Sequence, residues 1–74
     1  MILINPDIEI DKSKLPKLLQ DIIKQLEEYE KEGKWIMYDG LFEALEANSK
    51  NFLLDDKITE KQFDLLMKKY GGYV

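Results

Sequence analysis

The 74-residue sequence predicts a mainly α fold, a three-helix bundle with an N-terminal extended arm or short β-hairpin. Three observations predict it. Apolar residues recur three or four positions apart in three stretches of the chain, as on one face of an α-helix. Glycine or turn residues separate these stretches and follow the last one. The length suits a single helical domain over residues 1–74, and 45% of the residues are apolar, a normal share for a globular protein.

Residues 1–12 do not follow the helical pattern. Two short alternating apolar pairs flank a turn sequence; they are Ile2 with Ile4, Ile8 with Ile10, and Asn5-Pro6-Asp7 between them. Two interpretations are open, a small hairpin and an extended arm laid over the helices. We favour the arm, because an isolated two-stranded hairpin is barely stable in water.

We expect the first helix over residues 14–32. Ser13 is placed to cap it, Pro16 falls in its first turn, and Gly33 is placed to end it in the left-handed conformation. One apolar stripe runs along the helix and should face the centre of the core. The stripe consists of Leu15, Leu18, Leu19, Ile22, Ile23, Leu26 and Tyr29.

We expect the second helix over residues 35–53, on a stripe that includes Trp35, Tyr38, Phe42 and Leu45. Gly40 inside this stretch costs about 1 kcal/mol if it is helical. A start near Asp39 is the alternative, but the earlier start is favoured because Trp35 and Tyr38 share the stripe. The short connection around Gly33 makes the first two helices antiparallel neighbours.

The third helix is expected over residues 60–70. Thr59 and Gln62 are spaced as a capping box, in which each side chain accepts a hydrogen bond from the backbone N–H of the other residue. Ile58 and Phe63 have the spacing of the hydrophobic staple that accompanies such a box. Gly71-Gly72 is expected to stop the helix.

The segment Asp55–Phe63 resembles the bacterial short C-terminal domain. In that family an Ile-Thr turn precedes a helix with a phenylalanine four residues on. The glycine that the family usually has before the Ile-Thr pair is Asp56 here. The resemblance covers only this turn and the helix after it, and we take no function from it.

Composition argues against several kinds of chemistry. The chain has no histidine and no cysteine, which are the commonest general base and the usual zinc ligands, so we expect no enzyme, no cofactor and no metal site. Aligned as an EF-hand loop, Asn51–Gln62 has Leu53 where an oxygen ligand is needed and Gln62 where a bidentate glutamate is needed. A pocket for a small-molecule substrate is not expected in a domain of this size.

Charge argues against nucleic acid as the first choice. The net charge is −4 and there is no arginine, the commonest base reader. A helix-turn-helix module acting through the third helix is the alternative function. It would use the lysines near that helix, namely Lys57, Lys61, Lys68 and Lys69. The longest apolar run, Met1–Ile4, is too short for a signal peptide or a membrane span, so a cytoplasmic protein without a membrane partner is expected.

Binding to another protein is the class of function that remains. We expect a protein–protein interaction or self-association module, with a homodimer as one form. Tryptophan and tyrosine are enriched at interaction hot spots, and extra leucines add apolar area that one small core does not need. The candidate partner-binding residues, expected to be partly exposed, are Trp35, Tyr38, Leu41, Tyr70 and Tyr73.

Overall fold

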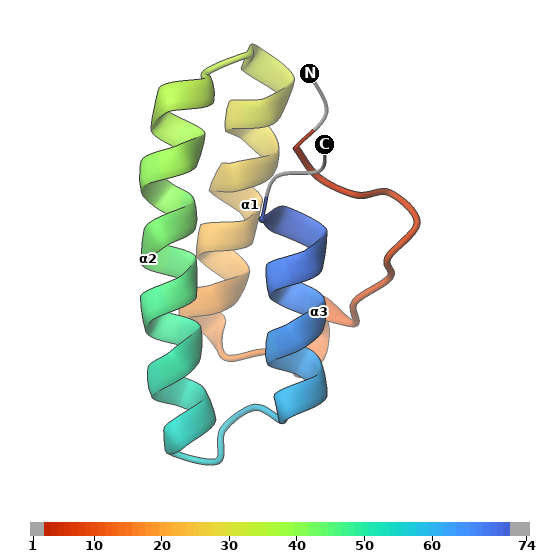
Figure 1. Ribbon diagram of the computed structural model, residues 1–74, viewed down its shortest axis with the longest axis vertical. Helices are drawn as coiled ribbons and strands as arrows, with labels where there is room; N and C mark the ends of the chain where they lie inside the picture. The colour runs from red at the N-terminus through yellow and green to blue at the C-terminus, as the bar shows by residue number, and fades with distance from the viewer. Residues whose placement is uncertain (1–2, 72–74) are drawn as a thin grey trace.

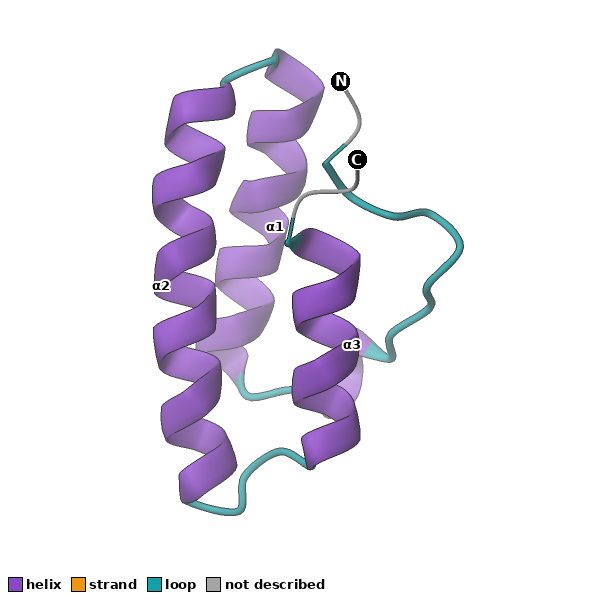
Figure 2. Ribbon diagram, in the orientation of Figure 1, coloured by secondary structure: helices purple, strands orange, loops and turns teal. Residues whose placement is uncertain are grey.

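The computed structural model describes residues 3–71, in which a short 3-10 turn, η1 (Lys12–Lys14), precedes three α-helices. These are α1 (Lys17–Glu32), α2 (Trp35–Leu54) and α3 (Glu60–Tyr70). The helices run alternately up and down, so that α2 is antiparallel to both α1 and α3 (Figure 1). No residue of the described range lies in a strand (Figure 2). The prediction of a mainly α fold with three helices is therefore confirmed.

The core lies between the three helices and is centred on α1. Five residues of the predicted stripe are buried, whereas Leu18 is 47% exposed; the buried ones are Leu15, Leu19, Ile22, Ile23 and Leu26. Burying apolar surface drives folding in proportion to the area removed from water, so this stripe is the main source of stability. The facing helices complete the core with Tyr38 and Leu45 from α2 and Leu66 and Tyr70 from α3.

α1 begins at Lys17, not at residue 14 as the sequence predicted. The predicted cap is wrong as well: the Asp11 side chain accepts the backbone N–H of Ser13 at 3.1 Å and caps η1. The reason for the late start is steric. Proline disfavours the helical conformation in the residue before it, and Leu15 is extended, with φ −92° and ψ 152°. Pro16 is consequently the N-cap of α1 rather than a residue of its first turn.

A left-handed residue ends each of the first two helices. Gly33 has φ 71° and donates to the Glu30 carbonyl at 3.1 Å, while the Lys34 N–H donates to the Tyr29 carbonyl at 2.9 Å. This arrangement pairs carbonyls that the helix leaves free, and glycine adopts it without a Cβ penalty. α2 starts directly afterwards at Trp35, the earlier of the two starts considered, with Gly40 inside the helix.

The turn after α2 has the same form without a glycine. Asp56 has φ 58°, and the Lys57 N–H donates to the Phe52 carbonyl at 2.8 Å. Asp56 stands where the resemblance to the short C-terminal domain leads one to expect glycine, and it takes up the backbone conformation that glycine favours.

The capping box of α3 is confirmed. The Thr59 hydroxyl accepts the Gln62 N–H at 3.1 Å, and the Gln62 side-chain oxygen accepts the Thr59 N–H at 2.7 Å. Ile58 is buried and Phe63 packs against the core, as a hydrophobic staple requires. Gly71 follows the helix because its backbone passes close to the last turn: an added Cβ would lie 2.3 Å from the Met67 carbonyl oxygen.

Residues 3–11 form a bent loop, so the prediction of an extended arm or a hairpin is not supported. They contain no strand, and Ile2 of the predicted hairpin lies outside the described residues. The Asn5 side chain accepts the Asp7 N–H at 2.9 Å, a local turn that bends the chain away from an extended path.

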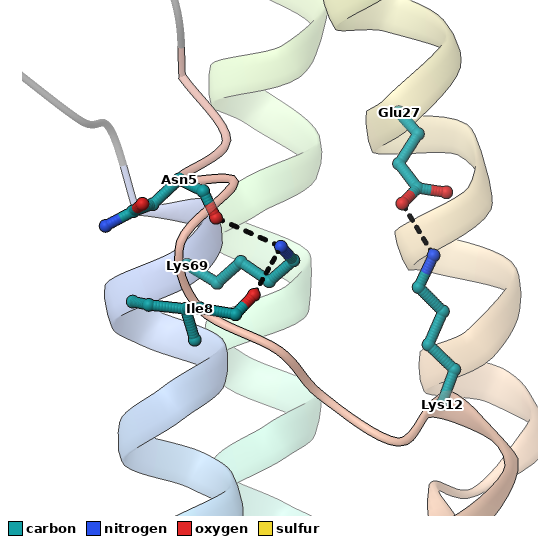
Figure 3. A network of polar contacts seen from close by, with 5 residues as sticks. All are labelled: Asn5, Ile8, Lys12, Glu27 and Lys69. Carbon is teal, nitrogen blue, oxygen red and sulfur yellow. Dashed lines mark hydrogen bonds and ion pairs between the residues drawn. The ribbon is translucent and has the colours of Figure 1, made fainter.

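Charged side chains from two helices hold this loop. The Lys69 ammonium of α3 donates to the carbonyls of Asn5 at 3.0 Å and Ile8 at 2.7 Å (Figure 3). The Glu30 carboxylate of α1 accepts the N–H groups of Leu3 and Ile4 at 2.8 and 2.7 Å. Below the loop, Lys12 forms an ion pair with Glu27 at 2.6 Å (Figure 3). The loop is therefore fastened to α1 and α3 through its backbone.

Candidate protein-interaction surface

The side of α2 that faces away from the other two helices carries exposed aliphatic side chains at both ends. Ile36 is 90% exposed and Leu54 is 81% exposed. Each lies nine residues from Leu45, which is two and a half turns at 3.6 residues per turn. Because Leu45 is fully buried, both residues point away from the core. We call this side the outer face of α2; it consists of Ile36, Gly40, Glu43, Ala47, Lys50 and Leu54, all of them exposed.

The first turn of α2 carries three exposed apolar side chains. Trp35, Ile36 and Met37 follow one another, and all three are exposed. The tight turn at Gly33 connects α1 to α2, and α3, which is shorter, ends short of the first turn of α2 (Figure 1). Together with Gly33 and Lys34 these three side chains line a shallow apolar depression, and exposed apolar surface of this kind is a feature of interaction sites.

A shallow apolar hollow of about 300 Å³ adjoins this turn. It lies where the beginning of α2, the end of α3 and the loop at Leu3 meet. Its lining is made by Leu3, Trp35, Ile36, Tyr38, Asp39, Phe42, Tyr70 and Gly71. The surface therefore combines a protruding side chain, Ile36, with a depression beside it.

Tyr38 and Tyr70 form the floor of this region and are core residues. They are 2% and 0% exposed, so the partial exposure expected of them is not found. The Tyr38 hydroxyl donates to the Tyr70 carbonyl at 2.7 Å and ties α2 to the end of α3. Burial raises the pKa of Tyr38, and the negative charge of Glu30 raises it further. Burial also raises the pKa of Tyr70, with a smaller effect from Glu27.

The other candidate binding residues are placed differently. Trp35 is exposed to 36%, and Leu41 is partly buried against the core. Tyr73 lies outside the described residues. The structure thus brings Trp35, Tyr38 and Tyr70 together around the hollow, with only Trp35 open to solvent.

Sequence reasoning missed Ile36 and Met37 as surface residues. Trp35, Ile36 and Met37 are all apolar, so their hydrophobicity does not indicate which of them faces the core. The signal was the phase of the helix: a position nine residues before a core leucine lies on the opposite side. Leu54 lies nine residues after Leu45 and is on the side opposite the core for the same reason.

The lysines considered for nucleic-acid binding do not form one free basic surface. Lys69 directs its ammonium at the loop carbonyls, as described above. Lys68 forms an ion pair with Asp64 at 2.9 Å. Lys57 and Lys61 are exposed. Two of the four are therefore engaged with the protein itself.

Two further findings concern residues 3–71 only. Within this range no three acidic side chains lie together as ligands for a metal ion. None of the helices there combines the length and the apolar character that a membrane crossing needs.

Comparisons with protein-family models, with curated proteins and with solved structures found no match to this chain. The likeness of Asp55–Phe63 to the short C-terminal domain thus remains a local one, on a turn and a capped helix.

Proposed function

We propose that this chain is a small non-enzymatic helical protein that acts as a protein–protein interaction or self-association module through the outer face and the first turn of α2. The supporting observation is the exposure of Ile36, at 90%, and Leu54, at 81%, on one helix face. A cytoplasmic location belongs to the same proposal.

Energetics support a role in binding. Fully burying one such aliphatic side chain is favourable by about 1.5 to 3 kcal/mol relative to leaving it in water. A single exposed leucine is ordinary, but large apolar residues concentrated on one helix offer a partner a substantial driving force. Trp35 beside them is the residue type most enriched at binding hot spots.

Charged groups on the outer face of α2 and beside the hollow suit a protein partner. Glu43 and Lys50 are exposed on the same face, and Asp39 lies at the rim of the hollow. Charged groups in an interface set the orientation and the specificity of binding. The arrangement supports recognition of one partner geometry.

The experiment is affinity capture with point variants, quantified by mass spectrometry. The wild-type chain is compared with Ile36→Ser and with Leu18→Ser, a matched control because Leu18 is an exposed leucine on α1. We expect Ile36→Ser to lose captured chains, including further copies of this protein, at least tenfold, and Leu18→Ser to retain them. Helix content measured by circular dichroism shows that both variants are folded.

Equal capture by the wild type and Ile36→Ser would overturn the proposal. So would an equal loss with Leu18→Ser, because the effect would then follow surface hydrophobicity in general rather than the outer face of α2.

A further inference from the structure

We infer that the outer face of α2 binds the same face of a second copy of this chain, with the two α2 helices antiparallel. This inference rests on the proposed function and names its partner. The outer face is symmetric about Leu45 in its spacing: the pairs Ile36 and Leu54, Gly40 and Lys50, and Glu43 and Ala47 are each centred on position 45.

That symmetry has a direct consequence for pairing. Consider a two-fold axis that is perpendicular to α2 and crosses the outer face at the level of Leu45. It places each member of a pair against the other member in the second copy, as an isologous dimer requires. Ile36 then meets Leu54 of the second copy at both ends of the contact. These are the two most exposed large apolar residues of the described chain.

The charges on the face fit the same arrangement. Lys50 of the second copy lies opposite Gly40, three residues or about 4.5 Å along the axis from Glu43. The same Glu43–Lys50 pair recurs on the other side of the axis. A Cβ placed on Gly40 would find no atom within 4 Å, so this position is open and leaves room for a lysine stem.

A parallel pairing of the same faces is disfavoured. It would set Glu43 against Glu43 and Lys50 against Lys50, and like charges placed opposite each other are repulsive. Charge complementarity therefore favours the antiparallel form. It also favours a second copy of this chain as the partner, because Glu43 in one half of the face complements Lys50 in the other half.

The size of the face indicates a weak, reversible dimer. Eighteen residues of helix are about 27 Å long, and a strip about 10 Å wide buries about 600 Å² over both copies. Stable complexes bury about 1,200 to 2,000 Å². The two copies also each carry a net charge of −4, which opposes association. We expect the dimer to form between about 10 μM and 1 mM, the range of weak encounters.

Charge reversal followed by sedimentation velocity at about 0.15 M salt tests the inference. We expect the wild type to shift from monomer to dimer with concentration. Glu43→Lys and Lys50→Glu should each weaken dimerisation at least tenfold, and the double variant Glu43→Lys/Lys50→Glu should restore it, because the pair is rebuilt with its signs exchanged. In a parallel dimer the double variant would repeat the like-charge contacts and the single variants would lose nothing.

Matched controls come from the exposed side of α1. Glu28→Lys and Lys24→Glu change the net charge by the same amounts, from −4 to −2 and from −4 to −6, away from the outer face of α2. Both should dimerise like the wild type. Equal weakening in these controls would show a general charge effect and overturn the inference.

Cross-linking fixes the direction of pairing. The chain has no cysteine, so an introduced thiol is unambiguous. A mixture of the Ile36→Cys and Leu54→Cys chains should give mainly the mixed disulfide dimer on oxidation. A predominance of either unmixed dimer would contradict the antiparallel arrangement.

The outcomes separate this inference from the proposed function. A wild type that stays monomeric up to 1 mM overturns the inference. Capture of a different protein that depends on Ile36 would then still support the proposed function, and its absence would remove both.

Discussion

The residue that links the helices most directly is Tyr38. Its hydroxyl crosses from α2 to the Tyr70 carbonyl at the end of α3, in a site where both rings are buried. Such a bond contributes little net free energy while it is made, but leaving its buried acceptor unpaired costs about 1 to 3 kcal/mol. The Tyr38 hydroxyl therefore helps to hold the end of α3 against α2.

We expect Tyr38→Phe to lower the free energy of unfolding by about 1 to 2 kcal/mol at pH 8, because the Tyr70 carbonyl loses its donor while the ring is retained. Urea titration measures the change. Tyr29→Phe is the matched control, since Tyr29 is only partly buried, and it should cost less. Equal losses in the two variants would contradict a special role for Tyr38.

The wild type and Tyr38→Phe should also differ in alkaline solution. The pKa of Tyr38 is raised in the folded chain, chiefly by burial, so folding favours the neutral phenol. Its contribution is complete below the unfolded pKa of about 10 and is lost as the pH rises above that value towards the folded pKa. We expect the stability of the wild type to fall more steeply between about pH 9 and 11 than that of Tyr38→Phe. A parallel fall in the two would be inconsistent with this assignment.

At the scale of elements, the turn between α2 and α3 carries a conformational cost. Asp56 is left-handed, at φ 58°, a conformation that costs an L-residue about 1 kcal/mol and glycine nothing comparable. We expect Asp56→Gly to stabilise the chain by about 0.5 to 1 kcal/mol in thermal or urea unfolding. The neighbouring Asp55 has φ −88°, so Asp55→Gly should be neutral or destabilising. Stabilisation by both variants would contradict the argument.

The N-terminal loop is held by side chains of α1 and α3 rather than by hydrogen bonds between strands. Lys69→Met keeps the apolar stem but removes both hydrogen bonds to the Asn5 and Ile8 carbonyls. We expect faster amide hydrogen exchange in peptides from residues 4–12 and a loss of about 1 to 2 kcal/mol in stability. Lys68→Met removes an exposed ion pair on the same helix and should leave the loop unchanged. Equal exchange in both variants would show that Lys69 does not hold the loop.

The elements differ in how far they could be predicted. The α1 stripe and the Thr59–Gln62 box depend on residues three or four apart, so their local spacing was sufficient to identify them. The start of α1 lies three residues later than the apolar spacing predicts, because Pro16 keeps Leu15 out of the helical conformation. The loop could not be foreseen, because Glu30 and Lys69 hold it from positions 26 and 64 residues away in the sequence.

At the scale of the whole molecule, the candidate surface too was only partly predictable from the sequence. Aromatic residue type pointed to Tyr38 and Tyr70, but tertiary packing buries them, since a small core needs its large rings. Ile36 was overlooked because its neighbours Trp35 and Met37 are equally apolar. The phase of α2 relative to the buried Leu45 makes Ile36 the most exposed of the three.

The free energy of unfolding of the whole molecule should depend on which apolar side chains of α1 are buried, and not on how many apolar residues α1 contains. A chain of 74 residues is expected to have about 4 to 11 kcal/mol of stability, and a buried leucine cut to alanine costs about 2 to 5 kcal/mol. Leu19 is fully buried and Leu18, next to it, is 47% exposed. We therefore expect Leu19→Ala to abolish or greatly lower the cooperative thermal transition, and Leu18→Ala to leave it close to the wild type. Composition and helix propensity change identically in the two variants, so only the position of the side chain differs. A cooperative melt of Leu19→Ala near the wild-type midpoint would mean that the core is not where the structure puts it.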